Sequence, residues 1–474
     1  MANQQGRADD SIAVAIASLV EEFRVQLEND AAAFSAARRA GGGPIIIAEV
    51  GTMTRIVSPG TYDPHHVSIG PYHMINSPDL ARDDEKKRSL AAVLSAATSA
   101  GATPQVYLEA VASLEDQARR CYAHSFEHVI KRRDFLRMLL LDGCYLLHRL
   151  GVVRRGNVAA ATANGHGGAP PISAAGDGGD SSFLETAAVL RDVLYLAENQ
   201  IPFFVLDKIH QLTFPNHGVS AAETIAGYVG ELLKRQQYST VTLPAPAPAP
   251  APEPGNLLHL LHMHLRPSEL GEASAGGADT GKRVHRWRTA TEYHFVGVEM
   301  KKRPLTEGGA RCILDVKLNG GGALEIPPLV IDAETWRLLR NLMALEQRNP
   351  AIGRHVTSYC VFVSQLASTE ADVDRLSRKG IIEHGLGNNA QVAGCFADLC
   401  KGVVYDPGRS YLRATCQELE MRFQSRPRRW MAWLGHKYFG NPWLAVGLVA
   451  AAVGLTCTVV QAVYSVLSYR PGAN

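Results

Sequence analysis

The sequence predicts a mainly α protein: a compact multi-helix body with one small antiparallel β-sheet, followed by a single C-terminal transmembrane helix. Helical spacing of apolar residues recurs along most of the chain. One region, 291–331, changes to strand-like alternation, and an uncharged apolar run lies near the end of the sequence. The 474 residues carry a net charge of +2. We therefore expect no nucleic-acid partner, because the chain has no overall basic field.

Residues 1–40 are expected to form an N-terminal amphipathic helix. Its apolar run, Ile12–Val20, follows Asp9 and Asp10 rather than a basic segment. This order is not that of a signal peptide. Asp10 or Ser11 can instead cap a helix that begins here.

Residues 41–425 are expected to form one helical domain that flexible inserts interrupt. The inserts are Gly/Ala-rich at 156–182, carry an Ala-Pro repeat at 243–255, and are rich in small residues at 271–282. Such compositions bury too little apolar surface to order themselves. Helical patterns occupy 104–124, 126–150, 183–210, 221–237, 257–265, 352–365, 369–379, 388–402 and 408–425.

The small sheet is expected at about 291–331. Glu292–Lys301 alternates between apolar and polar residues, and Arg311–Leu318 is rich in strand formers. A glycine turn after Asn319 leads into two further short strands, Leu324–Ile326 and Leu329–Ile331. Asp332 is expected to cap the next helix, which should extend through Gln347.

The end of the chain is expected to anchor it in a membrane. Trp443–Leu467 contains no charged residue, and as a helix it would be about 37 Å long, enough to cross a hydrocarbon core of about 30 Å. A basic and aromatic juxtamembrane segment, 426–442, precedes it, and a short tail, 468–474, follows. The positive-inside rule then places the N-terminal body in the cytosol, at the plasma membrane or an endomembrane. The flanking basic residues are Arg422, Arg426, Arg428, Arg429 and Lys437.

One face of this predicted span carries small and polar residues at helical spacing. Small residues let two helices approach closely, and a polar side chain in lipid requires a partner. We expect the span to self-associate or to pair with another membrane helix. The alternative is that small residues are simply common in such helices. The face consists of Gly447, Ala451, Gly454, Thr458, Gln461 and Ser465.

Cysteine usage is typical of a reducing compartment. The chain has eight cysteines, which form no Cys-x-x-Cys pair, and no Asn-x-Ser/Thr glycosylation site is present. Both observations agree with a cytosolic body whose thiols are free.

Several segments, in order, resemble the motifs of a plant family known as domain of unknown function 247. The first is Tyr62–His73 (YDPHHVSIGPYH), the second Met138–Leu147 (MLLLDGCYLL) and the third Glu198–Leu206 (ENQIPFFVL). Further similar blocks are Ala290–Lys301, Leu324–Asp332, Val356–Val363, Lys379–Ile382, Asn441–Trp443 and Tyr464–Tyr469. The resemblance implies a membrane-associated plant protein with no established enzymatic activity. It also implies a link to cell recognition, since some grass members are implicated in self-incompatibility.

The polar residues of these motifs have two interpretations. They define the fold by satisfying backbone groups where helices are broken, as expected before Pro202. Alternatively, the first and third motifs build a polar cleft lined by Asp63, Asp142 and Glu198. The candidate residues are Asp63, His65, His66, Tyr72, His73, Asp142, Glu198, Asn199 and Gln200.

Local patterns for cofactors and metals are incomplete, so we expect neither a cofactor nor a metal. The phosphate-loop-like segment 276–282 lacks the following Ser or Thr. The Gly-x-Gly-x-x-Ala pattern at 385–390 lacks a second parallel strand in the prediction, and Asn388 explains it as a helix cap. His259, His262 and His264 have no carboxylate or cysteine at ligand spacing. We expect these histidines at a helix surface or interface.

The resulting hypothesis is a membrane-anchored interaction or signalling protein with a protein partner or self-association, and no inferred small-molecule substrate. One alternative is a membrane-tethered enzyme, such as a hydrolase, that uses the polar cleft. Another is a structural membrane scaffold. An enzyme needs a nucleophile or metal close to a base, whereas a binding module needs an exposed apolar patch with a polar rim.

Overall fold

The computed structural model describes residues 44–97, 102–153, 180–215, 219–241, 253–269, 288–306, 308–425 and 442–468. The predicted N-terminal helix (1–40), the loop 276–282 and most of the three predicted inserts lie outside these residues. Where the first insert was expected to extend to 182, a helix already begins at Asp180.

The first half of the body is a group of helices around α7 (Arg132–Arg149). The middle of α7 is buried on nearly all sides, and it packs against α4, α5 and α10. Gly143 permits the close contact with α10, because a Cβ there would lie 2.4 Å from the Ile209 side chain. The other elements of this half are α2 (Thr52–Val57), α3 (Pro71–Asn76), η1 (Pro78–Leu80), α4 (Asp83–Ala96), α5 (Pro104–Ala112), α6 (Glu115–Arg120), α9 (Asp180–Tyr195), α10 (Phe203–Thr213) and α11 (Ala221–Arg235).

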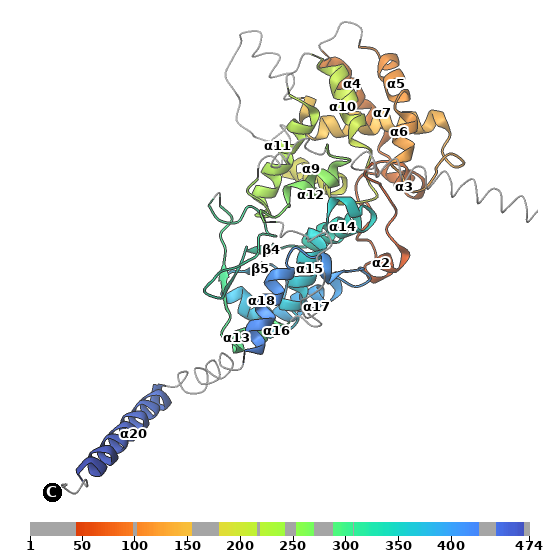
Figure 1. The fold of residues 1–474 in the computed structure, drawn as a ribbon. Coiled ribbons are helices and arrows are strands. Elements are labelled where there is room, and N and C mark those ends of the chain that lie inside the picture. The colour runs from red at the N-terminus through yellow and green to blue at the C-terminus, as the bar shows by residue number, and fades with distance from the viewer. Residues whose placement is uncertain are drawn as a thin grey trace, which may run out of the picture.

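The second half combines helices with two small sheets. Figure 1 shows α4, α5, α7 and α10 at one end of the body and α13, α16 and α18 toward the other. Its elements are α12 (Leu257–His264), α13 (Ala290–Phe295), β1 (Glu299–Lys302), β2 (Lys317–Leu318), β3 (Ala323–Ile326), β4 (Leu329–Ile331), α14 (Thr335–Arg348), η2 (Pro350–Ile352), α15 (His355–Leu366), α16 (Glu370–Arg378), β5 (Ile382–His384), α17 (Asn389–Leu399), η3 (Pro407–Arg409) and α18 (Arg413–Gln424).

The predicted single antiparallel sheet is wrong. The first sheet has the order β1-β3-β2, in which β1 is parallel and β2 antiparallel to β3. In the second sheet, β4 and β5 pair in parallel. The start of the predicted strand 292–301 is helix α13, because Thr289 and Glu292 form a capping box. Strand partners from distant segments cannot be read from local alternation.

The parallel pairing of β4 with β5 also corrects the statement that no second parallel strand lies beside the glycine loop 385–390. The alternative interpretation of this loop is confirmed. The Asn388 side chain accepts a hydrogen bond from the Gln391 N–H and caps α17. This cap satisfies a helix N–H with a side chain of the loop itself.

The C-terminal helix α20 covers Pro442–Ser468, close to the predicted span 443–467. Among the described residues, however, no helix is long and apolar enough to cross a membrane. This finding overturns the predicted transmembrane anchor. The predicted basic residues Arg426, Arg428, Arg429 and Lys437 lie outside the described part of the chain.

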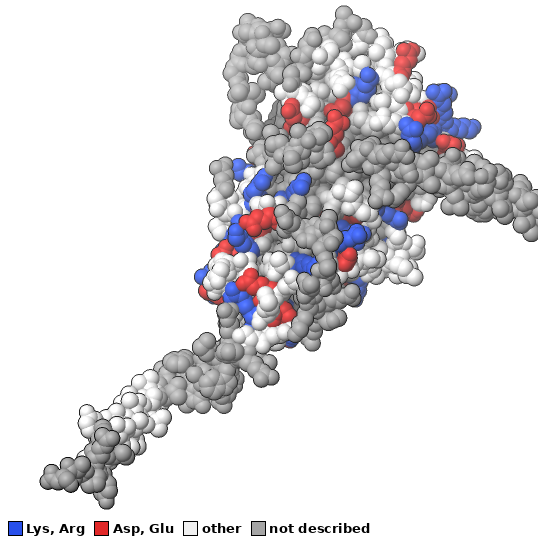
Figure 2. Space-filling view, viewed as in Figure 1, with Lys and Arg blue, Asp and Glu red and all other residues white. Residues whose placement is uncertain are grey.

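One continuous apolar core joins both halves of the body, from Ile47 near the start of the described chain to Leu419 in α18. Charged groups of both signs are interspersed on the face shown in Figure 2. The eight cysteines are free thiols, as the sequence predicted. Elements of the first half and of the second half therefore pack around the same core.

Candidate functional site

The third motif lies in the break between α9 and α10, and it contacts the first motif from there. Gln200 is buried. Its amide nitrogen donates to the carbonyls of Val193 (2.8 Å) and Leu196 (2.9 Å) at the end of α9. Its amide oxygen accepts from the N–H groups of Leu257 (3.1 Å) and Leu258 (3.3 Å), which begin α12. One side chain thus ends one helix and supports the start of another.

Asn199 holds the first motif in the same way. Its amide oxygen accepts from the Ile69 N–H at 2.6 Å. Its amide nitrogen donates to the carbonyls of Val67 (3.0 Å) and Asp192 (3.1 Å). The whole side chain is buried, so these bonds replace water for backbone groups that have no helix or sheet partner.

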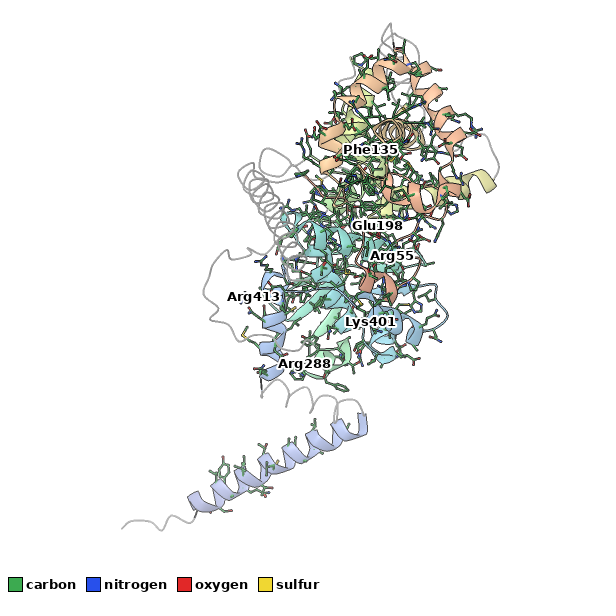
Figure 3. The ribbon with its side chains drawn as sticks, turned by 90° about the vertical axis from the view of Figure 1, so that its right-hand side faces the viewer. Arg55, Phe135, Glu198, Arg288, Lys401 and Arg413 are labelled. Atoms are coloured by element: carbon green, nitrogen blue, oxygen red, sulfur yellow. The ribbon has the colours of Figure 1, made fainter. Side chains whose placement is uncertain are left out.

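Glu198 joins this network to helix α2. One carboxylate oxygen accepts from the Val50 N–H at 2.6 Å, and both oxygens lie 2.6 Å from Nη2 of Arg55. The other guanidinium nitrogen of Arg55 donates to Asp63. Figure 3 shows Arg55 and Glu198 together in the middle of the body. Burial raises the pKa of Glu198, while the Val50 hydrogen bond and Arg55 act in the opposite direction.

Asp192 is a member of the network that the sequence analysis missed. One oxygen accepts from three successive N–H groups of the first motif, those of His65 (2.9 Å), His66 (2.6 Å) and Val67 (3.3 Å). The other oxygen lies 3.0 Å from Nη2 of Arg337 in α14. A carboxylate that receives several N–H groups and a guanidinium is well stabilised in a buried place.

Asp142 in α7 completes the contacts of the first motif. It accepts from the Gly70 N–H at 2.8 Å and lies 2.6 Å from Nζ of Lys86. Lys86 also donates to the Ser68 carbonyl at 2.7 Å. Burial raises the pKa of Asp142, and the charge of Lys86 opposes that shift. Of the basic residues in the run Asp83–Lys87, Lys86 is therefore the one that binds the first motif and Asp142.

The remaining candidates of the first motif differ in exposure. The backbone of His65 is held by Asp192 while its side chain is exposed, and His66 is half-buried. Tyr72 donates to the Ile47 carbonyl at 3.1 Å and packs edge-on against Tyr122. These contacts favour the interpretation that the motif residues define the fold.

A surface hollow of about 420 Å³ is lined in part by Tyr122, whose ring contacts Tyr72 of the first motif. It is lined by Asp116, Arg119, Arg120, Tyr122, Ala123, His124, Ser125, Phe126, Glu127 and Phe135. None of the carboxylates of the predicted polar cleft contributes to this lining, because their oxygens face backbone N–H groups, Arg55 and Lys86.

The three histidines of α12 are buried. Of the two predicted places, a helix surface is therefore wrong, whereas His262 and His264 do lie at interfaces with other helices. His264 lies against the carbonyls of Leu260 (2.9 Å) and Ala226 (3.1 Å). Nε2 of His262 lies 2.8 Å from Glu346 of α14, and its ring lies beside that of His355 of α15. Glu346 and His355 were missed because they follow His262 at long sequence separations, with no motif that links them.

The predicted pairing face of α20 makes no contact with the body. No atom lies within 4 Å of where a Cβ would stand at Gly447 or Gly454. Thr458 donates back to the Gly454 carbonyl at 2.8 Å, and Ala451, Gln461 and Ser465 are exposed. Self-association through this face therefore stays a prediction. Arg422, predicted as a flanking basic residue, pairs with Glu418 at 2.7 Å.

Replacing Gly70 by alanine is expected to lower the free energy of unfolding by about 2–4 kcal/mol, through strain at positive φ and overpacking. Gly70 has φ +72°, and an added Cβ would lie 2.4 Å from the Gln200 carbonyl oxygen. The control is Gly60→Ala, at φ +74° with no atom within 4 Å, which should cost about 1 kcal/mol or less. Urea unfolding of both variants measures the difference, and equal losses would contradict the close contact.

Acidification is expected to destabilise the fold through His73. Burial lowers the pKa of His73 to about 4, whereas the unfolded side chain has a pKa of about 6.5. As the pH falls from about 6.5 to 4, the unfolded chain takes up a proton that the folded chain does not. The free energy of unfolding should therefore fall by about 1–3 kcal/mol over this window.

The variant His73→Gln should show a shallower loss of stability between these pH values. Urea unfolding at several pH values gives the slopes. Exposed His128 provides the control, since His128→Gln should retain the wild-type slope. A His73→Gln slope equal to that of the wild type would show that folding does not lower the pKa of His73.

A family model described as a plant protein of unknown function matches residues 47–457. A UPF0481 protein of Arabidopsis thaliana is 26% identical over 437 residues, which cover 87% of this chain and 84% of that protein. No solved structure matches the chain significantly.

The family match includes the three motifs whose polar residues form the buried network. It confirms the resemblance that these motifs indicate. Because the match extends over most of the sequence, the chain belongs to this plant family, domain of unknown function 247.

Proposed function

We propose that this protein is an interaction module that binds another protein through an exposed apolar surface on helix α2. The motif residues support this proposal indirectly. The carboxylates of Asp142, Asp192 and Glu198 are buried and engaged by backbone N–H groups and basic side chains. They hold the fold rather than face a substrate. No contact of these residues favours the alternatives of a hydrolase or a scaffold.

The observation that carries the proposal is the exposure of apolar side chains on α2. Met53 is 76% and Ile56 66% exposed, and no residue of α2 is buried. Thr54 lies against the turn at Gly402, which is followed by Val404, 74% exposed. Met53, Ile56, Val57 and Val404 form what we call the α2 patch. A cluster of exposed large apolar groups is typical of a protein-binding surface.

Ion pairs of Arg55 fix the α2 patch to the body of the protein. Arg55 lies between Met53 and Ile56 in sequence, and its guanidinium binds Glu198 and Asp63. In Figure 1, α2 lies beside α15 and α17 although its sequence is near the start of the chain. A binding surface that is already fixed loses less conformational entropy when its partner binds.

A polar rim adjoins the patch. Lys401 and Asp398 form an exposed ion pair next to the Gly402 turn. Figure 3 shows Lys401 below Arg55, toward the C-terminal half. An apolar centre with a charged border is the usual composition of a protein interface. For the process we propose cell recognition, such as self-incompatibility, and its support is the family resemblance alone.

The double substitution Met53→Asp with Ile56→Asp should remove partner binding, because two carboxylates would be buried in an apolar interface. Proximity labelling in the native plant tissue, with the labelling enzyme fused to the full chain, identifies partners of the wild type. A partner that binds the patch should be enriched about tenfold less with the variant than with the wild type. This corresponds to a loss of about 1.4 kcal/mol or more of binding free energy.

The matched control is Val129→Asp, which places a carboxylate at a residue that is 65% exposed just before α7. It should leave the labelling unchanged. Equal labelling by all three proteins would refute the patch as an interface. Sedimentation of the purified wild type and double variant identifies self-association: a dimer lost only in the double variant would make the partner a second copy.

A further inference from the structure

A buried cluster of two imidazoles and one carboxylate lies outside the motif network. His262 is in α12, Glu346 near the end of α14, and His355 is the first residue of α15. Their potential ligand atoms all lie within 4.8 Å of one another. The rings of His262 and His355 have centroids 4.1 Å apart. All three side chains are buried.

Glu346 is held as an acceptor. It receives the N–H groups of Val356 (2.9 Å) and Thr357 (2.8 Å) and the Thr357 hydroxyl (2.6 Å). Among the described residues, the ion pair at Glu346 is formed by His262 and by no lysine or arginine. A fully buried carboxylate without a cation is unfavourable. A bound cation would supply the missing charge.

His355 gives an independent indication. Its Nε2 is buried and makes no hydrogen bond within the described structure, which is unusual for a buried polar atom. The neutral imidazole is the form that binds a metal through such a nitrogen.

We propose that His262, Glu346 and His355 bind one divalent transition-metal ion of the zinc type. Two imidazole nitrogens with one carboxylate oxygen form a ligand set that such ions accept, with water in the fourth position. Zinc bonds of about 2.0–2.1 Å place tetrahedral ligands about 3.3 Å apart. The ligand atoms, which lie within 4.8 Å of one another, would have to approach by up to about 1.5 Å through side-chain rotation to reach this geometry.

The site would be structural. Its three ligands come from α12, α14 and α15, so the ion would connect a helix near the middle of the chain to a helix pair of the second half. The Thr357 contacts to Glu346 orient the carboxylate, as outer-shell hydrogen bonds do at metal sites. An ion that binds only the folded chain raises its stability.

The experiment begins with the wild-type full chain, stripped of metal with a chelator and then titrated with Zn²⁺. We expect one zinc per chain by elemental analysis and a thermal midpoint several degrees higher, reversed by the chelator. Substitution with Co²⁺ should give the visible bands of nitrogen and oxygen ligands. Failure to take up metal, or a thiolate-to-cobalt band, would overturn the proposal without any variant.

The variants Glu346→Gln and His355→Gln should each weaken zinc binding by about 100-fold and remove the thermal shift. His264→Gln is the matched control, because it removes a buried histidine of the same helix whose nitrogens face carbonyl oxygens. It should retain one zinc per chain. Circular dichroism checks that each variant folds. Unchanged zinc affinity in folded Glu346→Gln and His355→Gln would contradict the assigned ligands.

Discussion

The fold depends on the satisfaction of backbone groups by three consecutive side chains, Glu198, Asn199 and Gln200. They lie where the chain leaves α9 and before Pro202, so the local backbone has no helical hydrogen bonds of its own. Their amides and carboxylate bind backbone groups of the first motif, of the segment before α2, and of α12. Removal of one partner would leave buried polar groups without water or protein, which is the costly case for hydrogen bonds.

The same network determines what the surface presents. The Arg55–Glu198 ion pair fixes the short helix α2 to the motif network, and Thr54 lies against Gly402 of the second half, while the apolar residues of α2 face outward. A six-residue helix with no buried residue has little reason to be ordered alone. The buried charge pair is therefore the physical link between the family motifs and the α2 patch.

The cluster of His262, Glu346 and His355 has a different character. In the motif network, the carboxylates of Asp142, Asp192 and Glu198 each have a lysine or arginine partner. In the cluster, Glu346 has no such partner among the described residues, and Nε2 of His355 is buried without a hydrogen bond. The two sites are adjacent in the fold through α12, whose first N–H groups bind Gln200. Gln200 thus helps to fix the start of α12, the helix that carries the candidate ligand His262.

Local sequence determined the elements whose causes are local. Apolar spacing predicted most of the longer helices but not α4, and it did not predict the break between α9 and α10. Asn388 predicted the cap of α17, because a cap depends on residues within one turn. Tertiary structure alone decided the pairing of β1 with β3 and of β4 with β5, since parallel partners come from distant segments. It also brought Asp192 and Arg337 into the network and Glu346 and His355 to His262. The predicted membrane anchor was wrong, because no helix among the described residues is both long and apolar enough to cross a membrane. Long-range contacts form through chain folding, and no spacing rule in one sequence specifies which distant polar groups will meet.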